Sequence, residues 1–122
     1  MTEKWQIHHQ ESFKAKVDLS GKQNLLMKVS ADEEVDTAGA GDKCVGVLMN
    51  KPAAAGRGAE VMTAGVAMLI AGATVAIGDY IKSDAAGKGI KTTTAGDEVV
   101  GRAESAANAS EQFKLRILPF RY

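Results

Sequence analysis

The chain alternates apolar and polar side chains over several short stretches. In residues 13–19 every odd position is apolar and every even position is charged, and residues 112–117 and 25–29 show similar alternations. A period of two is the spacing of a strand with one buried face. No window of about 12 residues carries the apolar stripe of a helix. The pattern therefore predicts an all-β fold.

Further strands are expected where short runs rich in Val, Ile and Thr lie between turn residues. The uncharged segment 61–78 approaches the length of a membrane span, but its glycines and alanines make it weakly hydrophobic. We interpret it as two buried strands joined at Ala71-Gly72. The expected fold is a compact small β-barrel or sandwich of short antiparallel strands. The additional strands are residues 44–49, 59–63, 66–70, 79–83, 89–93 and 98–103.

The first 12 residues depart from this pattern. They contain Trp5 and Ile7 in an otherwise polar setting. An exposed tryptophan is unfavourable unless it docks on another surface, so the segment is either a sheet-edge strand or an arm that reaches a neighbour. The 122 residues suit one domain of common size. We expect an N-terminal arm over residues 1–12 and a single β-rich domain over residues 13–122.

A weak internal repeat supports this organisation. Residues 41–46 and 96–101 share the pattern Gly-Asp-x-x-Val-Gly, and the two copies are 55 positions apart. Each copy is followed by a predicted strand, an alanine-rich loop and another strand. Glycine supplies a backbone with positive φ and aspartate bonds the backbone two residues on, so the pair forms a turn that begins a strand.

Composition indicates a thin core. Apolar residues make up 45% of the chain, but 20 residues are alanine. Five of the six aromatic residues lie near the two ends, Trp5 and Phe13 at one and Phe113, Phe120 and Tyr122 at the other. A small core in a chain of this size suggests that neighbouring subunits cover part of its apolar surface.

Charge argues against nucleic acid as a partner, because phosphate binding needs a basic face and the formal net charge is zero. An acidic stretch over residues 32–42 is interpreted as a solvated loop. It lacks the alternating oxygen ligands of a calcium-binding loop.

The sequence contains no complete motif for catalysis or for binding a cofactor. Gly87-Lys88-Gly89 lacks the flanking residues of a phosphate-binding loop. His8 and His9 are adjacent and would point to opposite faces of a strand, so they cannot share a metal ion. Cys44, the single cysteine, lies in an apolar run and is interpreted as a small buried residue. We expect no enzyme activity, no cofactor and no metal. The N-terminus lacks an apolar signal core, which favours synthesis in a reducing compartment.

The order of these motifs resembles the small capsid decoration (cement) proteins of tailed bacteriophages. The resemblance covers roughly residues 41–118. Turn glycines and β-branched residues carry it, and their order is more specific than any one of them. The motifs are Val45-Gly46-Val47-Leu48, the alanine-rich loop, residues 61–68 with Gly65-Val66, Gly78-Asp79-Tyr80-Ile81, Asp84, Gly87-Lys88, Thr92-Thr93-Thr94, Val100-Gly101-Arg102-Ala103 and the strand 114–118.

The resemblance implies a protein made in the host cytoplasm that binds the outside of an icosahedral head, with the major capsid protein as partner. It implies a homo-oligomer, with a trimer favoured, that reinforces the shell against the pressure of packaged DNA, without nucleic acid or membrane as partners. Arms that engage the capsid in such proteins would suit Trp5 and Ile7. We expect these two residues, with Phe120 and Tyr122, to contact the capsid or another subunit.

A second hypothesis is a small β-barrel that binds a ligand or single-stranded nucleic acid. Such barrels share this density of strands and use a basic face that carries aromatic side chains. The residues in the sequence that come closest to such a basic, aromatic set are Lys114, Arg116, Phe120, Arg121 and Tyr122.

Overall fold

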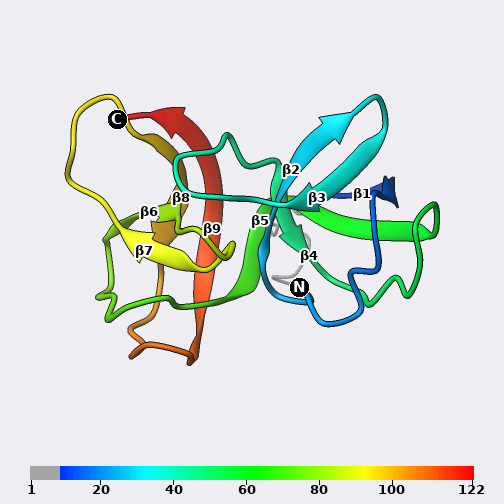
Figure 1. Cartoon of the computed structure of the whole chain (residues 1–122). Coiled ribbons are helices and arrows are strands. Elements are labelled where there is room, and N and C mark those ends of the chain that lie inside the picture. The colour runs from blue at the N-terminus through cyan, green and yellow to red at the C-terminus, as the bar shows by residue number, and fades with distance from the viewer. Residues whose placement is uncertain (1–8) are drawn as a thin grey trace, which may run out of the picture.

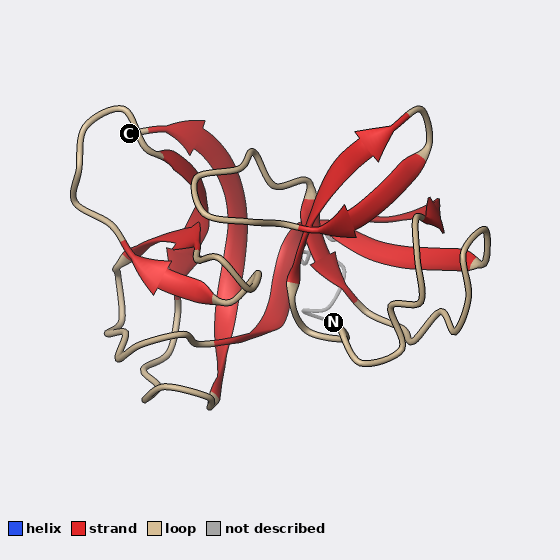
Figure 2. Ribbon diagram, viewed as in Figure 1, coloured by secondary structure: helices blue, strands red, loops and turns tan. Residues whose placement is uncertain are grey.

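A computed structural model describes residues 9–122, which form strands joined by turns and loops and contain no helix (Figures 1 and 2). The predicted all-β fold is confirmed. The strands are β1 (His9–Ala15), β2 (Leu26–Ala31), β3 (Glu34–Thr37), β4 (Gly46–Leu48), β5 (Gly58–Ile70), β6 (Tyr80–Ser83), β7 (Gly89–Lys91), β8 (Glu98–Ala103) and β9 (Gln112–Arg121).

The first five strands close into a small barrel, called the first barrel below. Their order is β1-β3-β2-β4-β5, and β5 pairs back to β1. Four of the five contacts are antiparallel, as expected, but β1 and β3 are parallel, with Ala15 opposite Val35. Closure removes the exposed strand edges that an open sheet of this size would present.

Strand β5 is shared between two units. Its first half pairs with β1 as far as Ala64 opposite His9, and its second half pairs with β9 from Gly65 opposite Ile117. Gly65 has a φ of +96°, a conformation that glycine adopts without the steric cost of a Cβ. The strand therefore passes from one unit to the next at this glycine.

The second unit, called the second barrel, contains the second half of β5 with β9, β8, β6 and β7 in that order. An isolated parallel bridge between Ala71 and Gly89 brings β7 to the end of β5, where the Gly72 amide donates to the Gly89 carbonyl at 2.9 Å. The unit is thus nearly closed. The two barrels lie side by side in Figure 1 and are joined through β5.

The two barrels repeat one topology. The strands β1, β2, β3, β4 and β5 correspond in order to the second half of β5, β6, β7, β8 and β9, because each pairs with equivalent neighbours in the same direction. The predicted internal repeat is therefore a structural duplication, with Gly46 on β4 and Gly101 on β8 as equivalent residues.

Local details repeat as well. Lys28 pairs with Asp42 at 3.1 Å in the first barrel, and Lys82 pairs with Asp97 at 2.9 Å at the equivalent place in the second. Positive φ angles recur at equivalent turns, which fixes the same chain path in both barrels. The equivalent pairs are Asn24 with Gly78, Gly41 with Gly96, and Gly56 with Ser110.

One face of the first barrel belongs to the core of the second. Leu26, Val47 and Met62 lie side by side on β2, β4 and β5, and all three are buried. They pack with the interior of the second barrel, around Phe113 and Leu69, and not with the interior of the first. We call these three residues the junction face.

Backbone hydrogen bonds hold the same junction. The Ile70 amide donates to the Asn24 carbonyl at 3.0 Å, and the Leu26 amide donates to the Gly87 carbonyl at 2.8 Å. A Cβ on Gly87 would collide with the Thr37 side chain, so the β6–β7 turn approaches the first barrel closely. The barrels are therefore fixed to one another by packing and by paired backbone groups.

Several sequence predictions need correction. The strand expected over residues 13–19 begins at His9 and ends at Ala15, where β1 leaves the barrel. Residues 59–63 and 66–70 form one continuous strand, and the second strand expected within 61–78 is a loop that makes one bridge at Val75. The acidic stretch contains β3, because Val35 is buried in the first barrel while its acidic neighbours face outward.

Candidate functional site

The four predicted contact residues fall in two places. Trp5 and Ile7 lie outside the described residues. Phe120 and Tyr122 lie at the end of the chain, with 40% and 42% of their surfaces exposed. β9 carries them beyond its last pairing with β5, because Ile117 is opposite Gly65, where β5 turns into the first barrel.

Phe120 and Tyr122 both contact Tyr80 of β6. The ring centroids are 5.2 Å and 5.7 Å from that of Tyr80, and both contacts are edge-to-face, at 82° and 83°. This geometry suits aromatic quadrupoles, which place a positive ring edge against a negative ring face. The two residues predicted from the chain end thus belong to one aromatic cluster.

Arg102 of β8 completes the cluster. Its guanidinium carbon lies 5.3 Å from the Tyr80 ring centroid, and its Nη2 donates to the Tyr80 hydroxyl at 3.3 Å. Such a cation–π contact is worth about 0.5–1 kcal/mol at exposed sites. We call Tyr80, Arg102, Phe120 and Tyr122 the aromatic face.

Strand register positions these side chains. Tyr80 is opposite Arg102 across β6 and β8, and Val99 is opposite Phe120 across β8 and β9. The Tyr122 amide donates to the Asp97 carbonyl at 2.8 Å, so the chain end is held against the β7–β8 turn. The sequence analysis missed Tyr80 and Arg102 as site residues, because register across three strands brings them to the chain end.

Most cations near the aromatic face are already paired. Arg116 binds Glu104 at 2.7 Å and Arg121 binds Glu98 at 3.2 Å. Lys82 binds Asp97, which also accepts a hydrogen bond from Thr92. Among the described residues, Arg102 has no carboxylate within ion-pair distance. This pairing disfavours the nucleic-acid hypothesis, since a phosphate would compete with carboxylates already in place.

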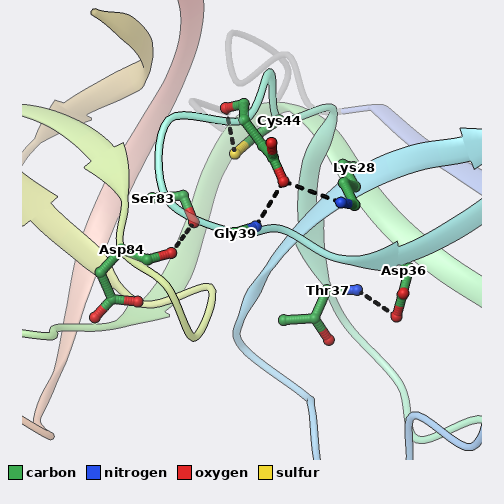
Figure 3. A network of polar contacts seen from close by, with 8 residues as sticks. Lys28, Asp36, Thr37, Gly39, Cys44, Ser83 and Asp84 are labelled. Carbon is green, nitrogen blue, oxygen red and sulfur yellow. Dashed lines mark hydrogen bonds and ion pairs between the residues drawn. The ribbon is translucent and has the colours of Figure 1, made fainter.

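The junction between the barrels holds a polar network that includes Cys44 (Figure 3). Asp42 accepts from the Gly39 amide and from Lys28, and these bonds keep the pKa of its carboxyl below the ordinary value. Burial, together with the negative charge of Asp42, raises the pKa of the Cys44 thiol to about 12. Cys44 is therefore a protonated, packed side chain at neutral pH.

The described residues offer little for other chemistry. No group of three or more His, Cys, Asp or Glu side chains within residues 9–122 could hold a metal ion. A shallow hollow beside Val75 and Ala107 contains Glu111, whose carboxylate accepts from the Asn108 amide. That stretch of chain also has no helix able to cross a membrane.

The described residues define an all-β protein with an exposed cluster of Tyr, Phe and Arg, and Tyr and Arg are enriched in protein–protein interfaces. Residues 21–118 match the phage cement protein family, so the chain belongs to that family. It is therefore a capsid-associated structural protein of a phage head.

A solved structure shares the whole fold. The head fiber gp8.5 N base of bacteriophage phi29 superposes with a TM-score of 0.74, covering 95% of this chain and 98% of that chain at 18% sequence identity. No sequence among curated proteins matches the chain. At this identity the likeness concerns the fold alone.

Proposed function

We propose that this protein decorates the outer surface of an icosahedral phage head and stabilises the shell against the pressure of packaged DNA. Its partner is the major capsid protein, and the working form is a homo-oligomer, with a trimer favoured. It acts without catalysis or a cofactor, is made in the host cytoplasm and resides on the outside of the virion.

Membership of the cement family is the observation that carries this proposal. The architecture is consistent with it. Two barrels share β5 and a buried junction, which gives a stiff body that transmits load between contacts instead of hinging. Repetition over many symmetric copies would let a modest contact per copy reinforce a whole shell.

Co-sedimentation tests the proposal. Purified protein is mixed with expanded heads that lack decoration, and bound protein is quantified after the heads are pelleted. We expect saturable binding, with a fixed number of copies per head, and a higher temperature for DNA release from decorated heads. Absence of saturable binding would overturn the proposal, and binding without a change in DNA release would overturn its stabilising part.

The aromatic face supplies a sharper variant for this assay. Phe120→Ala removes an exposed ring and leaves the strand pairing intact, so the fold should persist while head binding or subunit association weakens. Ile77→Ala is the matched control, because Ile77 is 73% exposed and is not among the four residues of the aromatic face. If Phe120→Ala binds heads and associates as well as the Ile77→Ala control does, Phe120 is not part of the contact.

A further inference from the structure

The duplication gives the junction face a counterpart in the second barrel. Leu26, Val47 and Met62 stand in one row across β2, β4 and β5. The same row across β6, β8 and β9 is Tyr80, Arg102 and Arg116. The row in the first barrel is covered by a neighbouring barrel within the chain, whereas Arg102 and Arg116 in the second barrel are exposed.

The two rows differ in chemistry in a way that fits their different partners. The junction face is aliphatic, as expected for a contact that never separates. Its counterpart carries Tyr and Arg and lies beside Phe120 and Tyr122. Interfaces between separately folded chains are enriched in these residue types and less apolar than permanent contacts.

The surface that receives the junction face also has a counterpart. In the second barrel, the Ile70 amide donates to the Asn24 carbonyl and the Gly87 carbonyl accepts from the Leu26 amide. The equivalents of Ile70 and Gly87 in the first barrel are Lys14 and Glu33, where the Lys14 amide donates to the Glu33 carbonyl at 2.7 Å. Those backbone groups are therefore already satisfied, so a partner there must bind through side chains.

Side chains at that position are opposite in charge to Arg102 of the aromatic face. The tip of the β2–β3 hairpin carries the exposed acids Asp32 and Glu33, next to Val29, which is 51% exposed. Arg102 has no carboxylate partner among residues 9–122, and Phe120 offers an apolar ring. Figure 1 shows the hairpin tip and the C-terminus at opposite ends of the molecule, so one copy cannot bring its own two surfaces together.

We propose that the aromatic face of one copy binds the β2–β3 hairpin tip of a second copy, head to tail, with Arg102 directed at Asp32 and Glu33. The proposal rests on the homo-oligomer of the proposed function and assigns the surfaces that hold it together. Because the two surfaces differ, the contact is heterologous. In a closed ring, each copy then contributes its aromatic face to one neighbour and its hairpin tip to the other.

Charge reversal with a compensating swap tests this contact. Arg102→Glu places like charges opposite one another, and so does Glu33→Lys, whereas the double variant restores opposite charges. Mass is measured by sedimentation velocity from about 10 μM to about 1 mM, a range that detects weak association. Arg57→Glu is the matched control, because Arg57 is exposed on a turn and belongs to neither of the two proposed surfaces.

The wild type and Arg57→Glu should associate with rising concentration, and each single reversal should weaken association by about tenfold or more. The double variant should recover most of it. Constant monomer mass in the wild type, or no recovery in the double variant, would overturn the proposal. Circular dichroism verifies that each variant is folded, which separates loss of contact from loss of structure.

Co-sedimentation of the same variants with undecorated heads separates the two proposals. If self-association does not respond to the swap but heads still bind the protein saturably, the head-to-tail contact is wrong and the proposed function stands. If the swap restores self-association but no variant binds heads, the contact stands and the proposed function is wrong.

Discussion

Gly46 and Gly101 occupy equivalent positions in the two barrels and meet equivalent obstacles. A Cβ on Gly46 would overlap the backbone carbonyl of Met62, and a Cβ on Gly101 would overlap that of Arg116. In each barrel the glycine lets a short strand lie directly against its long neighbour. The Gly-Asp-x-x-Val-Gly repeat therefore conserves a packing requirement as well as a turn.

Replacing either glycine by alanine should destabilise the protein. The obstacle is backbone, which cannot rotate away, so the strands must separate locally. We expect Gly46→Ala and Gly101→Ala each to lower the free energy of unfolding by about 1–3 kcal/mol or more, as overpacking does. Urea denaturation measures this. Gly21→Ala is the control, because nothing lies within 4 Å of its added Cβ, and an equal loss there would contradict the packing argument.

Leu26→Ala should weaken both barrels. Leu26 lies on a strand of the first barrel but packs in the core of the second. Removing a buried leucine typically costs about 2–5 kcal/mol. Hydrogen exchange followed by mass spectrometry should show faster exchange in β6, β8 and β9 as well as in β2. Exchange that rises in the first barrel alone would mean that the barrels are energetically independent.

Acid should remove a contribution to stability from the two equivalent ion pairs. Hydrogen bonds from the Gly39 amide and Lys28 lower the pKa of Asp42, and those from Lys82 and Thr92 lower the pKa of Asp97. A lowered folded-state pKa stabilises the fold above the unfolded value, and this stabilisation disappears as pH falls through the folded value. Asp97→Asn should therefore flatten the decline in melting temperature between neutral pH and pH about 3. An unchanged decline would contradict this assignment.

Truncation should distinguish the first eight residues from the next four. His9 to Ser12 belong to β1 and pair with β5, and the Ser12 hydroxyl donates to Glu60 at 2.6 Å. Removing residues 1–12 should open the first barrel and lower the melting temperature. Removing residues 1–8 keeps the pairing of β1 with β5 and should lower the melting temperature less than removing residues 1–12 does. If Trp5 and Ile7 contact the capsid, this shorter truncation should also weaken head binding. A large stability loss from the shorter truncation would contradict this division.

Cys44 should resist alkylation in the folded protein. A thiol with a pKa of about 12 holds almost no thiolate at pH 8, and thiolate is the reacting species. Iodoacetamide labelling followed by mass spectrometry should be slow in buffer and fast in denaturant, where the pKa returns to its ordinary value. Rapid labelling of the folded protein would show that the junction around Cys44 opens.

Alternation along the sequence indicated which residues face a core, but not which core. Leu25, Leu26 and Met27 are all buried, although a strand places neighbours on opposite faces. Leu25 and Met27 point into the first barrel, and Leu26 points into the second. The run of three apolar residues thus marks the start of β2, where both faces of the strand are buried, and the partner on each face comes from a distant segment.

The amino-acid sequence is sufficient to predict the all-β class, the approximate place of most strands, the repeat around Gly46 and Gly101, and the aromatic chain end with Phe120 and Tyr122. These features depend on local alternation, turn chemistry and composition. The folded arrangement is needed to show that β1 and β3 pair in parallel, that β5 belongs to two barrels, and that Tyr80 and Arg102 lie against the chain end. Strand pairing depends on contacts between residues far apart in sequence, and those contacts leave little record in the local pattern.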